Sequence, residues 1–508
     1  MRVRLSARQS ELAKLQALTV GKLLSEKFEI DYLFRESLGD KNLTDPLWRM
    51  PEKGVFTEDF VNDLIQQKTD LVVHSWKDLP ILDRPETEIV STLPRADHRD
   101  MLLFKKASRS KKSVKIFSSS PRREFHLKDS LPTMIPDPVS KIEFLPVRGN
   151  IQTRIKKLIQ DPQVDGLIVA KAAIDRLITQ QHFAPTQEFV FTSLGQFEFM
   201  VIPTEICPSA AAQGALAIEV KKGVSDLVSF LIQNRDSETF ECVQYERQIL
   251  KAFGGGCHQK IGVHIRKLVG KYFVCVSGKT DAGESLEFRK LVRTVNVSEI
   301  VRDSKVAKPN QLPPWIFSSQ ELSAFTLRKK TESEWDSSLP TLVSKADALL
   351  DAKPPTGIVW ASGLKTWQKL SQKGVWVNGS LEGLGEAELP KSFSWISGDL
   401  SWQKLTHGSR GDHSPSEEAA VKAIGTYQIN LKSEWQSFFE KRKHECTHFF
   451  WTSGYYFNAA ISRYPDLKDR IHACGPGNTL KALQAAAVSA KVCLSAMDLA
   501  LDGDDKSG

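Results

Sequence analysis

The chain has 508 residues, which is too long for one compact domain and predicts about three to five domains. Its apolar fraction of 41% and charged fraction of 26% are those of a globular protein. No apolar run approaches the roughly 18 residues that a membrane-spanning helix needs. The net charge of +8 favours anionic partners, either nucleic acid or small anions.

The seven cysteines are scattered, odd in number and without CxxC spacing. This pattern favours a reducing compartment over a disulfide framework. The first residues, MRVRLSARQS, lack the apolar region of a secretory signal. We therefore expect a cytoplasmic protein without membrane contact, and we expect it to be a monomer.

The first 300 residues alternate helical patterns with short apolar runs. Residues 10–24 predict a helix with Ser10 as its N-cap, and 70–75, 166–170 and 216–220 predict buried strands. Such alternation is typical of α/β layers with largely parallel sheets. Ligands bind such sheets beyond the carboxyl ends of the strands.

A polar, proline-bearing stretch at 303–314 predicts a linker. Nine of the eleven tryptophans follow residue 300, so 315–508 is expected to be a separate module. GIVWASG (357–363) and HFFWTSG (448–454) each predict a strand, a turn and a helix start. Two such units predict a two-lobed α/β module.

Basic residues of the N-terminal part stand at the ends of predicted elements. In SSSPRRE (118–124), Pro121 predicts a helix start with Ser120 as N-cap, and VRGNIQTR (147–154) repeats this pattern with Asn150 as cap. A helix N-terminus with guanidinium groups binds anions well. Each arginine alone is also compatible with solvated surface charge, but the repeated placement favours a lined cleft. The pattern lacks the interleaved aromatic residues of nucleic-acid binders and favours small polycarboxylates or phosphates.

Asp78 follows the strand at 70–75, in HSWKDLP, and is a carboxylate among cations. The cationic surroundings are expected to keep it ionised. It can stabilise a cationic intermediate, accept N–H groups, or serve as the structural partner of Lys77 or Arg99.

Cys257 stands behind three glycines in FGGGCHQKIG (253–262). Consecutive glycines allow tight turns and close approach to a ligand. A metal ligand, a disulfide, a nucleophile and a residue without function are the alternatives. His258 has no spaced partners, so we expect no metal site.

Seven stretches occur in an order that resembles one family: RLSARQSELAKLQA, KGVF, LVVHSWKDLP, SSSPRRE, VRGNIQTR, AAAQGALAIE and GGGCHQKIG. They resemble the hydroxymethylbilane synthases, also called porphobilinogen deaminases. The resemblance covers residues 4 to about 265 and continues more weakly to about 300. Three positions depart from the family pattern, where Phe117 and Ala212 replace glycines and RMPEKGVF lacks a Gly-Gly pair.

The resemblance implies three domains in the first 302 residues. Two lobes like those of periplasmic binding proteins would comprise 1–94 with 193–212 and 95–192. A small α+β domain, 213–302, would carry the cysteine.

The resemblance further implies a dipyrromethane cofactor, bound as a thioether to Cys257. Four porphobilinogen units would be added to it head to tail, each with loss of ammonia, and released as hydroxymethylbilane. Asp78 matches the catalytic aspartate, which would stabilise the cation left when ammonia departs. Each pyrrole carries an acetate and a propionate, so the resemblance implies contacts to cofactor or substrate from these residues: Arg8, Ser10, Lys53, Ser75, Lys77, Ser118, Ser119, Ser120, Arg122, Arg123, Arg148, Asn150, Arg154 and Arg176.

The C-terminal module resembles uroporphyrinogen-III synthase, which cyclises hydroxymethylbilane, in VWASG, GTYQ, FWTSG and ACGPGNTLKAL. This resemblance points to Ser362, Tyr427, Ser453 and Thr479 as contact residues. HECTH (444–448) matches a zinc-protease signature, which needs both histidines on one helical face. Because the following residues predict a strand, we expect no zinc site.

The sequence thus predicts a bifunctional tetrapyrrole enzyme. Two alternatives stay open: a hydroxymethylbilane synthase with a non-catalytic C-terminal domain, and a non-enzymatic anion-binding protein whose cysteine is merely buried.

Overall fold

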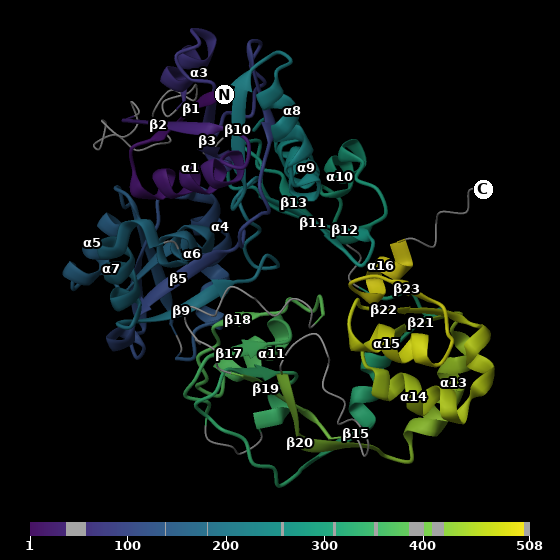
Figure 1. The fold of residues 1–508 in the computed structure, drawn as a ribbon. Coiled ribbons are helices and arrows are strands. Elements are labelled where there is room, and N and C mark those ends of the chain that lie inside the picture. Colours follow the sequence, from purple (N-terminus) through teal and green to yellow (C-terminus); the bar gives the residue numbers. More distant parts are fainter. Residues whose placement is uncertain are drawn as a thin grey trace. The chain divides into compact units, whose positions relative to one another are not determined.

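The computed structural model describes residues 1–36, 57–137, 139–179, 181–255, 259–307, 311–349, 354–385, 401–408 and 421–501. The chain divides into two compact units (Figure 1). The N-terminal unit contains Met1–Pro132 and Asp137–Val306, and the C-terminal unit contains Thr133–Pro136 and Ala307–Gly508. The division after Val306 falls inside the predicted linker 303–314.

The first sheet of the N-terminal unit has the strand order β2-β1-β3-β10-β4. Alternate residues of β1, Val3 and Leu5 among them, are fully buried and pack with Val20 and Leu24 of helix α1. Strands β1, β2 and β3 are parallel, whereas β10 is antiparallel to both neighbours, so the sheet is mixed. The elements of this lobe are β1 (Arg2–Arg8), α1 (Glu11–Leu24), β2 (Glu29–Arg35), α3 (Glu58–Ile65), β3 (Leu71–Ser75), β4 (Thr87–Ser91), β10 (Leu216–Lys221) and α8 (Asp226–Gln233).

The second sheet has the order β7-β6-β8-β5-β9 and forms the second lobe. Strand β6 is parallel to β7 and β8, and β5 is antiparallel to β8 and β9. Helix α6 of this lobe packs against α1 of the first lobe. The elements are β5 (Asp100–Lys105), β6 (Ser113–Phe117), α4 (Pro121–Ser130), β7 (Lys141–Leu145), α5 (Ile151–Gln160), β8 (Gly166–Ala170), α6 (Lys171–Thr179), α7 (Ala184–Leu194) and β9 (Phe197–Ile202).

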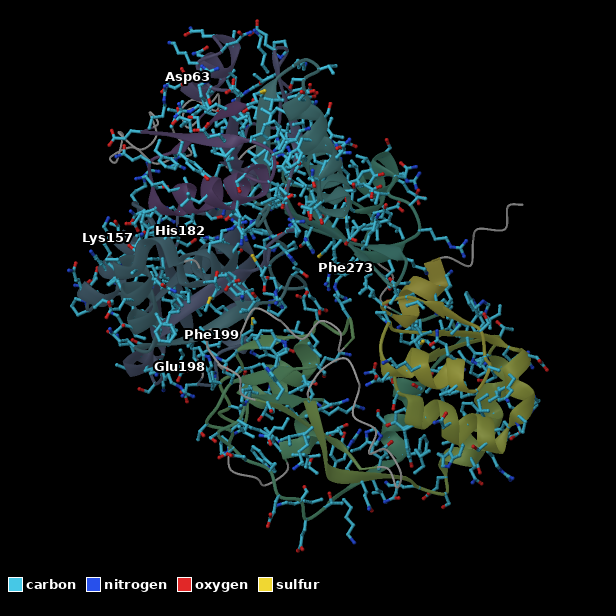
Figure 2. All side chains as sticks on the ribbon, viewed as in Figure 1. Asp63, Lys157, His182, Glu198, Phe199 and Phe273 are labelled. Atoms are coloured by element: carbon cyan, nitrogen blue, oxygen red, sulfur yellow. The ribbon has the colours of Figure 1, made fainter. Side chains whose placement is uncertain are left out.

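The predicted lobe boundaries are wrong where the chain returns to the first lobe. The prediction places 193–212 in the first lobe, but β9 pairs with β5 in the second sheet. Figure 2 shows Glu198 and Phe199 of β9 well separated from Asp63 of α3 in the first lobe. The prediction also places β10 and α8 in the domain 213–302, whereas both contribute to the core of the first lobe. Strands β9 and β10 are each apolar enough to suit either sheet. The residues of a strand therefore do not predict which sheet it joins.

The remaining part of this unit is a three-stranded antiparallel sheet with two helices, the α+β domain expected from the sequence. Helix α9 packs against β11 and α10, and its Ile249 shares a core with Val263 and Val274. The elements are α9 (Ser237–Ala252), β11 (Gly262–Leu268), β12 (Lys271–Lys279), β13 (Ser285–Val292) and α10 (Val297–Asp303).

The α+β domain also holds the two segments that join the lobes, 92–99 and 203–215. Arg95 donates from Nε to the carbonyl oxygen of Gln213 (2.9 Å) and forms an ion pair with Glu246 of α9 (2.6 Å). The ring of His98 stacks on that of His264 in β11, with centroids 3.5 Å apart. The crossing between the lobes is therefore fixed by buried side chains of this domain.

The C-terminal unit contains two sheets, of orders β14-β21-β22-β23 and β15-β20-β19-β16-β17-β18. All pairings are parallel except that of β15 with β20. The predicted strand-to-helix turns at 357–363 and 448–454 are present as β17–α11 and β21–α14. The first sheet includes β14 (Ile316–Ser318), α13 (Trp435–Glu445), β21 (His448–Trp451), α14 (Gly454–Arg463), β22 (Ile471–Cys474), α15 (Asn478–Ala485), β23 (Ala490–Val492) and α16 (Ala496–Leu501). The second includes β15 (Thr326–Lys330), β16 (Thr341–Val343), β17 (Val359–Ala361), α11 (Leu364–Ser371), β18 (Gly379–Ser380), β19 (Trp402–His407) and β20 (Val421–Leu431).

Among the described residues, no helix has the length and apolar character needed to cross a membrane.

Candidate functional site

A cleft of about 320 Å³ lies in the N-terminal unit where β3 and β8 end and where helices α1, α5 and α6 begin. Such a position, beyond the carboxyl ends of strands, is the usual binding site of α/β folds. The cleft brings together ten of the predicted residues: Arg8, Ser10, Ser75, Lys77, Asp78, Arg123, Arg148, Asn150, Arg154 and Arg176.

Asp78 is the one carboxylate among the described residues that line this cleft. It ends a single 3-10 turn, Trp76–Asp78, which directly follows β3. The side chain is exposed and forms no hydrogen bond or ion pair with a described residue. The structural role with Lys77 or Arg99 is therefore not observed, and Arg99 pairs with Asp97 instead (2.8 Å).

The cations opposite Asp78 are held in an unfavourable environment. Burial, together with the neighbouring guanidinium groups of Arg123 and Arg148, lowers the pKa of Arg154 to about 10, whereas Asp78 opposes the shift. Burial likewise lowers the pKa of Arg176 to about 10. Positive charges that repel one another in a partly buried cleft favour the binding of anions.

Lys77 adds an amine to this cluster. Its Nζ donates to Oε1 of Gln213 (3.1 Å). Burial lowers the pKa of Lys77, the charge of Asp78 raises it, and that of Arg123 lowers it again. Gln213 therefore orients the amine, and a bound carboxylate would stabilise its charged form.

Arg122 and Arg123 begin α4 as predicted, but they have different surroundings. Nη2 of Arg122 and Nη2 of Arg123 donate to the two oxygens of the buried Asp100, at 2.8 and 2.7 Å. Burial raises the pKa of Asp100, but the two guanidinium groups lower it well below its ordinary value. Arg122 also donates to the carbonyl oxygen of Pro208 (2.6 Å) and is only 4% exposed. The structure thus places Arg122 outside the residues that line the described cleft, whereas Arg123 lines it.

The serines before α4 support the local backbone and do not line the described cleft. Ser120 is the N-cap, accepting from the backbone N–H of Arg123 (3.5 Å), and Ser118 accepts from that of Ser120 (3.3 Å). Ser119 donates to the carbonyl oxygen of Val147 and accepts from its N–H, both at 2.8 Å. Direct contacts from these hydroxyls to a ligand in this cleft are therefore not supported.

Lys53 and Cys257 lie outside the described residues. The glycines before Cys257 are described in part: Gly254 and Gly255 have φ of +91° and +44°, the left-handed region that favours glycine. A Cβ on Gly255 would lie 2.7 Å from Cδ1 of Ile81, three residues after Asp78. The glycine loop therefore approaches the segment that follows Asp78.

Two important residues were not among the predicted site residues. Asp100 anchors both arginines of α4, and Gln213 contacts Lys77 and also donates to Asp100 (2.9 Å). Gln213 stands inside the motif AAAQGALAIE, which is a usable signal. No sequence signal marks Asp100, because a carboxylate at the start of a strand cannot be distinguished from a surface carboxylate until the fold shows that it is buried.

Comparison with known proteins identifies the family of the chain that contains this cleft. The family model described as "Porphobilinogen deaminase, dipyromethane cofactor binding domain" matches residues 3–229. The porphobilinogen deaminase of Caldicellulosiruptor saccharolyticus is 32% identical over 281 residues, which cover 54% of this chain and 88% of that protein. The chain belongs to the porphobilinogen deaminase family.

Other relatives agree. The probable porphobilinogen deaminase of Picrophilus torridus is 32% identical over 53% of this chain and 86% of its own length. The porphobilinogen deaminase of Limosilactobacillus reuteri is 29% identical over 61% and 92%. The solved structure of the methionine-binding protein MetQ covers 50% of this chain and 96% of its own, at 11% identity and a TM-score of 0.25, which is too low to support an argument.

The observed residues fit the dipyrromethane cofactor of the family domain. Its two pyrroles carry an acetate and a propionate each, so the group is strongly anionic. Six cationic side chains and one carboxylate line the cleft, and two of the guanidinium groups have lowered pKa values: the cations are Arg8, Lys77, Arg123, Arg148, Arg154 and Arg176. This set would hold the carboxylates of a deaminase cofactor and substrate.

The four residues predicted as contacts in the C-terminal unit lie in different surroundings. Ser362 donates to the carbonyl oxygen of Ser344 (2.6 Å), Ser453 is the N-cap of α14, and Thr479 lies in the first turn of α15. Tyr427 of β20 is only 1% exposed, and burial raises its pKa to about 12. A buried core ring does not fit the predicted role of Tyr427 as a contact residue.

The HECTH sequence does not form a zinc site in the structure. His444 lies near the end of α13, whereas His448 begins β21, so the two histidines do not share a helical face. No cluster of metal-binding side chains occurs among the described residues.

Proposed function

We propose that the N-terminal unit polymerises four porphobilinogen molecules head to tail, with loss of ammonia, into hydroxymethylbilane. The observation that carries this proposal is the single exposed carboxylate of Asp78, facing a cluster of partly buried cations. A polymer that gains two carboxylates with each added pyrrole needs such a cluster. A reaction that passes through a cationic pyrrole needs one carboxylate within it.

Each group has a distinct role in this proposal. Cys257 would hold the cofactor, which would supply the pyrrole end to which substrate is added. Asp78 stabilises the cation that departure of ammonia leaves on the substrate and orients the pyrrole N–H groups. The guanidinium groups bind the acetate and propionate side chains.

Intact-mass measurement after expression tests the cofactor attachment. A two-pyrrole adduct on the wild-type chain, absent from Cys257→Ser, is expected. An unmodified wild-type chain made with substrate available would favour a non-enzymatic anion-binding protein. Asp78→Asn is expected to keep the adduct but lose turnover by at least about 100-fold, and near-normal turnover would refute the role of Asp78.

We further propose that the C-terminal unit cyclises hydroxymethylbilane to uroporphyrinogen III. Support comes from two sheets, parallel apart from the pairing of β15 with β20, whose strand ends approach each other. Gly385, beyond β18, has φ of +106°, and a Cβ there would lie 2.7 Å from the carbonyl oxygen of Pro476, beyond β22. The ring of His407, at the end of β19, lies 6.3 Å from that of Tyr455, at the start of α14.

Product analysis separates an active second unit from a non-catalytic one. The full chain is supplied with porphobilinogen, and the closed isomers are separated by chromatography. Type III product without an added enzyme is expected. Type I product alone would show that the C-terminal unit does not catalyse cyclisation.

A further inference from the structure

One face of α9 packs against the turn that carries Asp78. Phe240 and Val243 of α9 share an apolar cluster with Trp76 and Leu79. The rings of Phe240 and Trp76 have centroids 5.4 Å apart. The α+β domain therefore contacts this turn directly.

Arg247 extends the same face of the helix, because it lies four residues after Val243. Its Nη1 donates to the carbonyl oxygens of Trp76 (3.4 Å) and Leu79 (3.3 Å), and its Nη2 donates to that of Pro80. These three carbonyl groups flank Asp78 on both sides. A guanidinium group presents its donors in a rigid plane, so it fixes the carbonyl groups relative to one another.

We propose that Arg247 is a positioning residue for the Asp78 carboxylate. The proposal rests on the proposed catalytic role of Asp78. Because that side chain has no hydrogen bond to a described residue, its place in the cleft depends on the backbone of its turn. Arg247 holds this backbone from outside the cleft, and it is not among the residues that line the cleft.

The same helix leads to the predicted cofactor anchor. Helix α9 ends at Ala252, and the glycine loop that follows approaches the segment after Asp78 at Gly255 and Ile81. Arg247 thus ties the carboxylate turn to the element that precedes Cys257. In this way the side chain of Arg247 sets the position of the Asp78 carboxylate relative to helix α9, the element that precedes Cys257.

Loss of Arg247 is expected to affect turnover rather than binding. Small displacements of a catalytic group can cost about 10- to 100-fold in rate. For Arg247→Met we expect kcat to fall by about this factor. The KM for porphobilinogen should change by no more than about 2-fold, because the cations that bind carboxylates stay in place.

Lys251 offers a matched control. It lies one turn further along α9 and reaches the same segment, at Asp83 (3.3 Å), but both side chains are largely exposed. It makes no described contact with the carbonyl groups of residues 76–80. Lys251→Met removes one positive charge from the same helix and should leave kcat unchanged.

The test compares Arg247→Met, Arg247→Lys and Lys251→Met in the full chain, each alone and with Asp78→Asn. Intact mass reports the covalent adduct, and thermal unfolding reports the fold. We expect the adduct in all variants, partial recovery of kcat in Arg247→Lys, and no further loss when Arg247→Met is added to Asp78→Asn. This non-additivity is the signature of a residue that acts through another.

The outcomes separate the two hypotheses. Near-normal turnover of Asp78→Asn alone refutes the proposed catalytic carboxylate. If Asp78→Asn is impaired but Arg247→Met lowers its residual rate by the same factor as in the wild type, Arg247 acts independently and the inference is overturned. Equal losses in Arg247→Met and Lys251→Met would also overturn it. Should Arg247→Met not fold, Arg247→Lys decides by the same comparison.

Discussion

Arg122 and Arg154 show how burial and partners assign opposite roles to one residue type. Arg122 is almost fully buried and is paired with Asp100. Arg154 lines the cleft, donates to the carbonyl oxygen of Gly149 (2.8 Å) and is repelled by neighbouring guanidinium groups. The first guanidinium contributes to folding, and the second is held at a cost in stability that anion binding offsets.

Replacing these two arginines should therefore change different quantities. Arg122→Met leaves Asp100 with one partner fewer in a buried site and should lower the free energy of unfolding by about 3 kcal/mol. Arg154→Gln removes a repelled charge and should leave stability unchanged or raise it by about 1 kcal/mol, while raising KM about 10-fold or more. Urea unfolding and steady-state kinetics on both variants measure the two effects.

The same two measurements would show if the roles given to Arg122 and Arg154 are wrong. If Arg154→Gln unfolds more readily than wild type and keeps its KM, the cleft residue is structural. If Arg122→Met keeps its stability, the pair with Asp100 contributes little.

Sequence reasoning could not separate Arg122 from Arg123. Both stand in the first turn of α4, and the pattern SSSPRRE correctly predicts that turn, because capping is a local property. Both arginines donate to Asp100, and what separates them is the further bond of Arg122 to the carbonyl oxygen of Pro208, which is 86 residues away in sequence. Local sequence signals therefore identify the segments that form the charged cleft. Only the fold identifies which of their side chains reach it.

At the scale of elements, helix N-termini form part of the cleft. Ser10 caps α1, accepting from the backbone N–H of Ala13 (3.4 Å), and Asn150 caps α5 through that of Thr153 (2.9 Å). Both caps line the cleft, whereas Ser120, the cap of α4, does not. The positive ends of α1 and α5 thus add to the attraction of the cleft for anions.

Ser10→Ala and Ser120→Ala should have similar effects on stability and different effects on function. Loss of either cap should cost about 1 kcal/mol in unfolding free energy. Only Ser10→Ala should raise KM, by about 3-fold, because only this hydroxyl borders the cleft. A rise in KM for Ser120→Ala alone would show that the hydroxyl of Ser120, and not that of Ser10, meets the substrate.

Sheet membership was the property of elements that the sequence predicted least well. The strands 71–75, 166–170 and 216–221 were found where apolar runs predict them. The assignment of β9 and β10 to lobes was wrong, because both follow long-range pairing that no local pattern records.

At the scale of the whole molecule, the N-terminal unit contains buried and partly buried histidines that resist protonation. Burial, together with the charges of nearby arginines, lowers the pKa of His126 and of His264 to about 4 and that of His98 well below its ordinary value. His98, which lies in the segment 92–99 that joins the two lobes, stacks on His264. Acid should therefore act first on the crossing between the lobes.

These shifts predict a fall in stability between pH 6.5 and about 4. The unfolded chain binds protons at these histidines below pH 6.5 and the folded chain does not, so stability rises with pH across this window. Each histidine contributes a slope of up to about 1.4 kcal/mol per pH unit. The pKa values of Glu219 and Glu246 are also lowered, both to about 2. These carboxylates affect stability at lower pH than the histidines, because the stabilisation they provide is lost only below about pH 4.5.

The slope is measured by urea unfolding at a series of pH values from 7.5 to 4.5, with pulse proteolysis reporting the unfolding of the N-terminal unit. His264→Phe keeps an aromatic ring beside His98 and should flatten the slope by about one proton. His182→Gln is the matched control, because His182 is exposed on the second lobe (Figure 2) and should leave the slope unchanged. A wild-type curve that is flat below pH 6.5, or equal flattening in both variants, would show that the stacked histidines do not control acid stability.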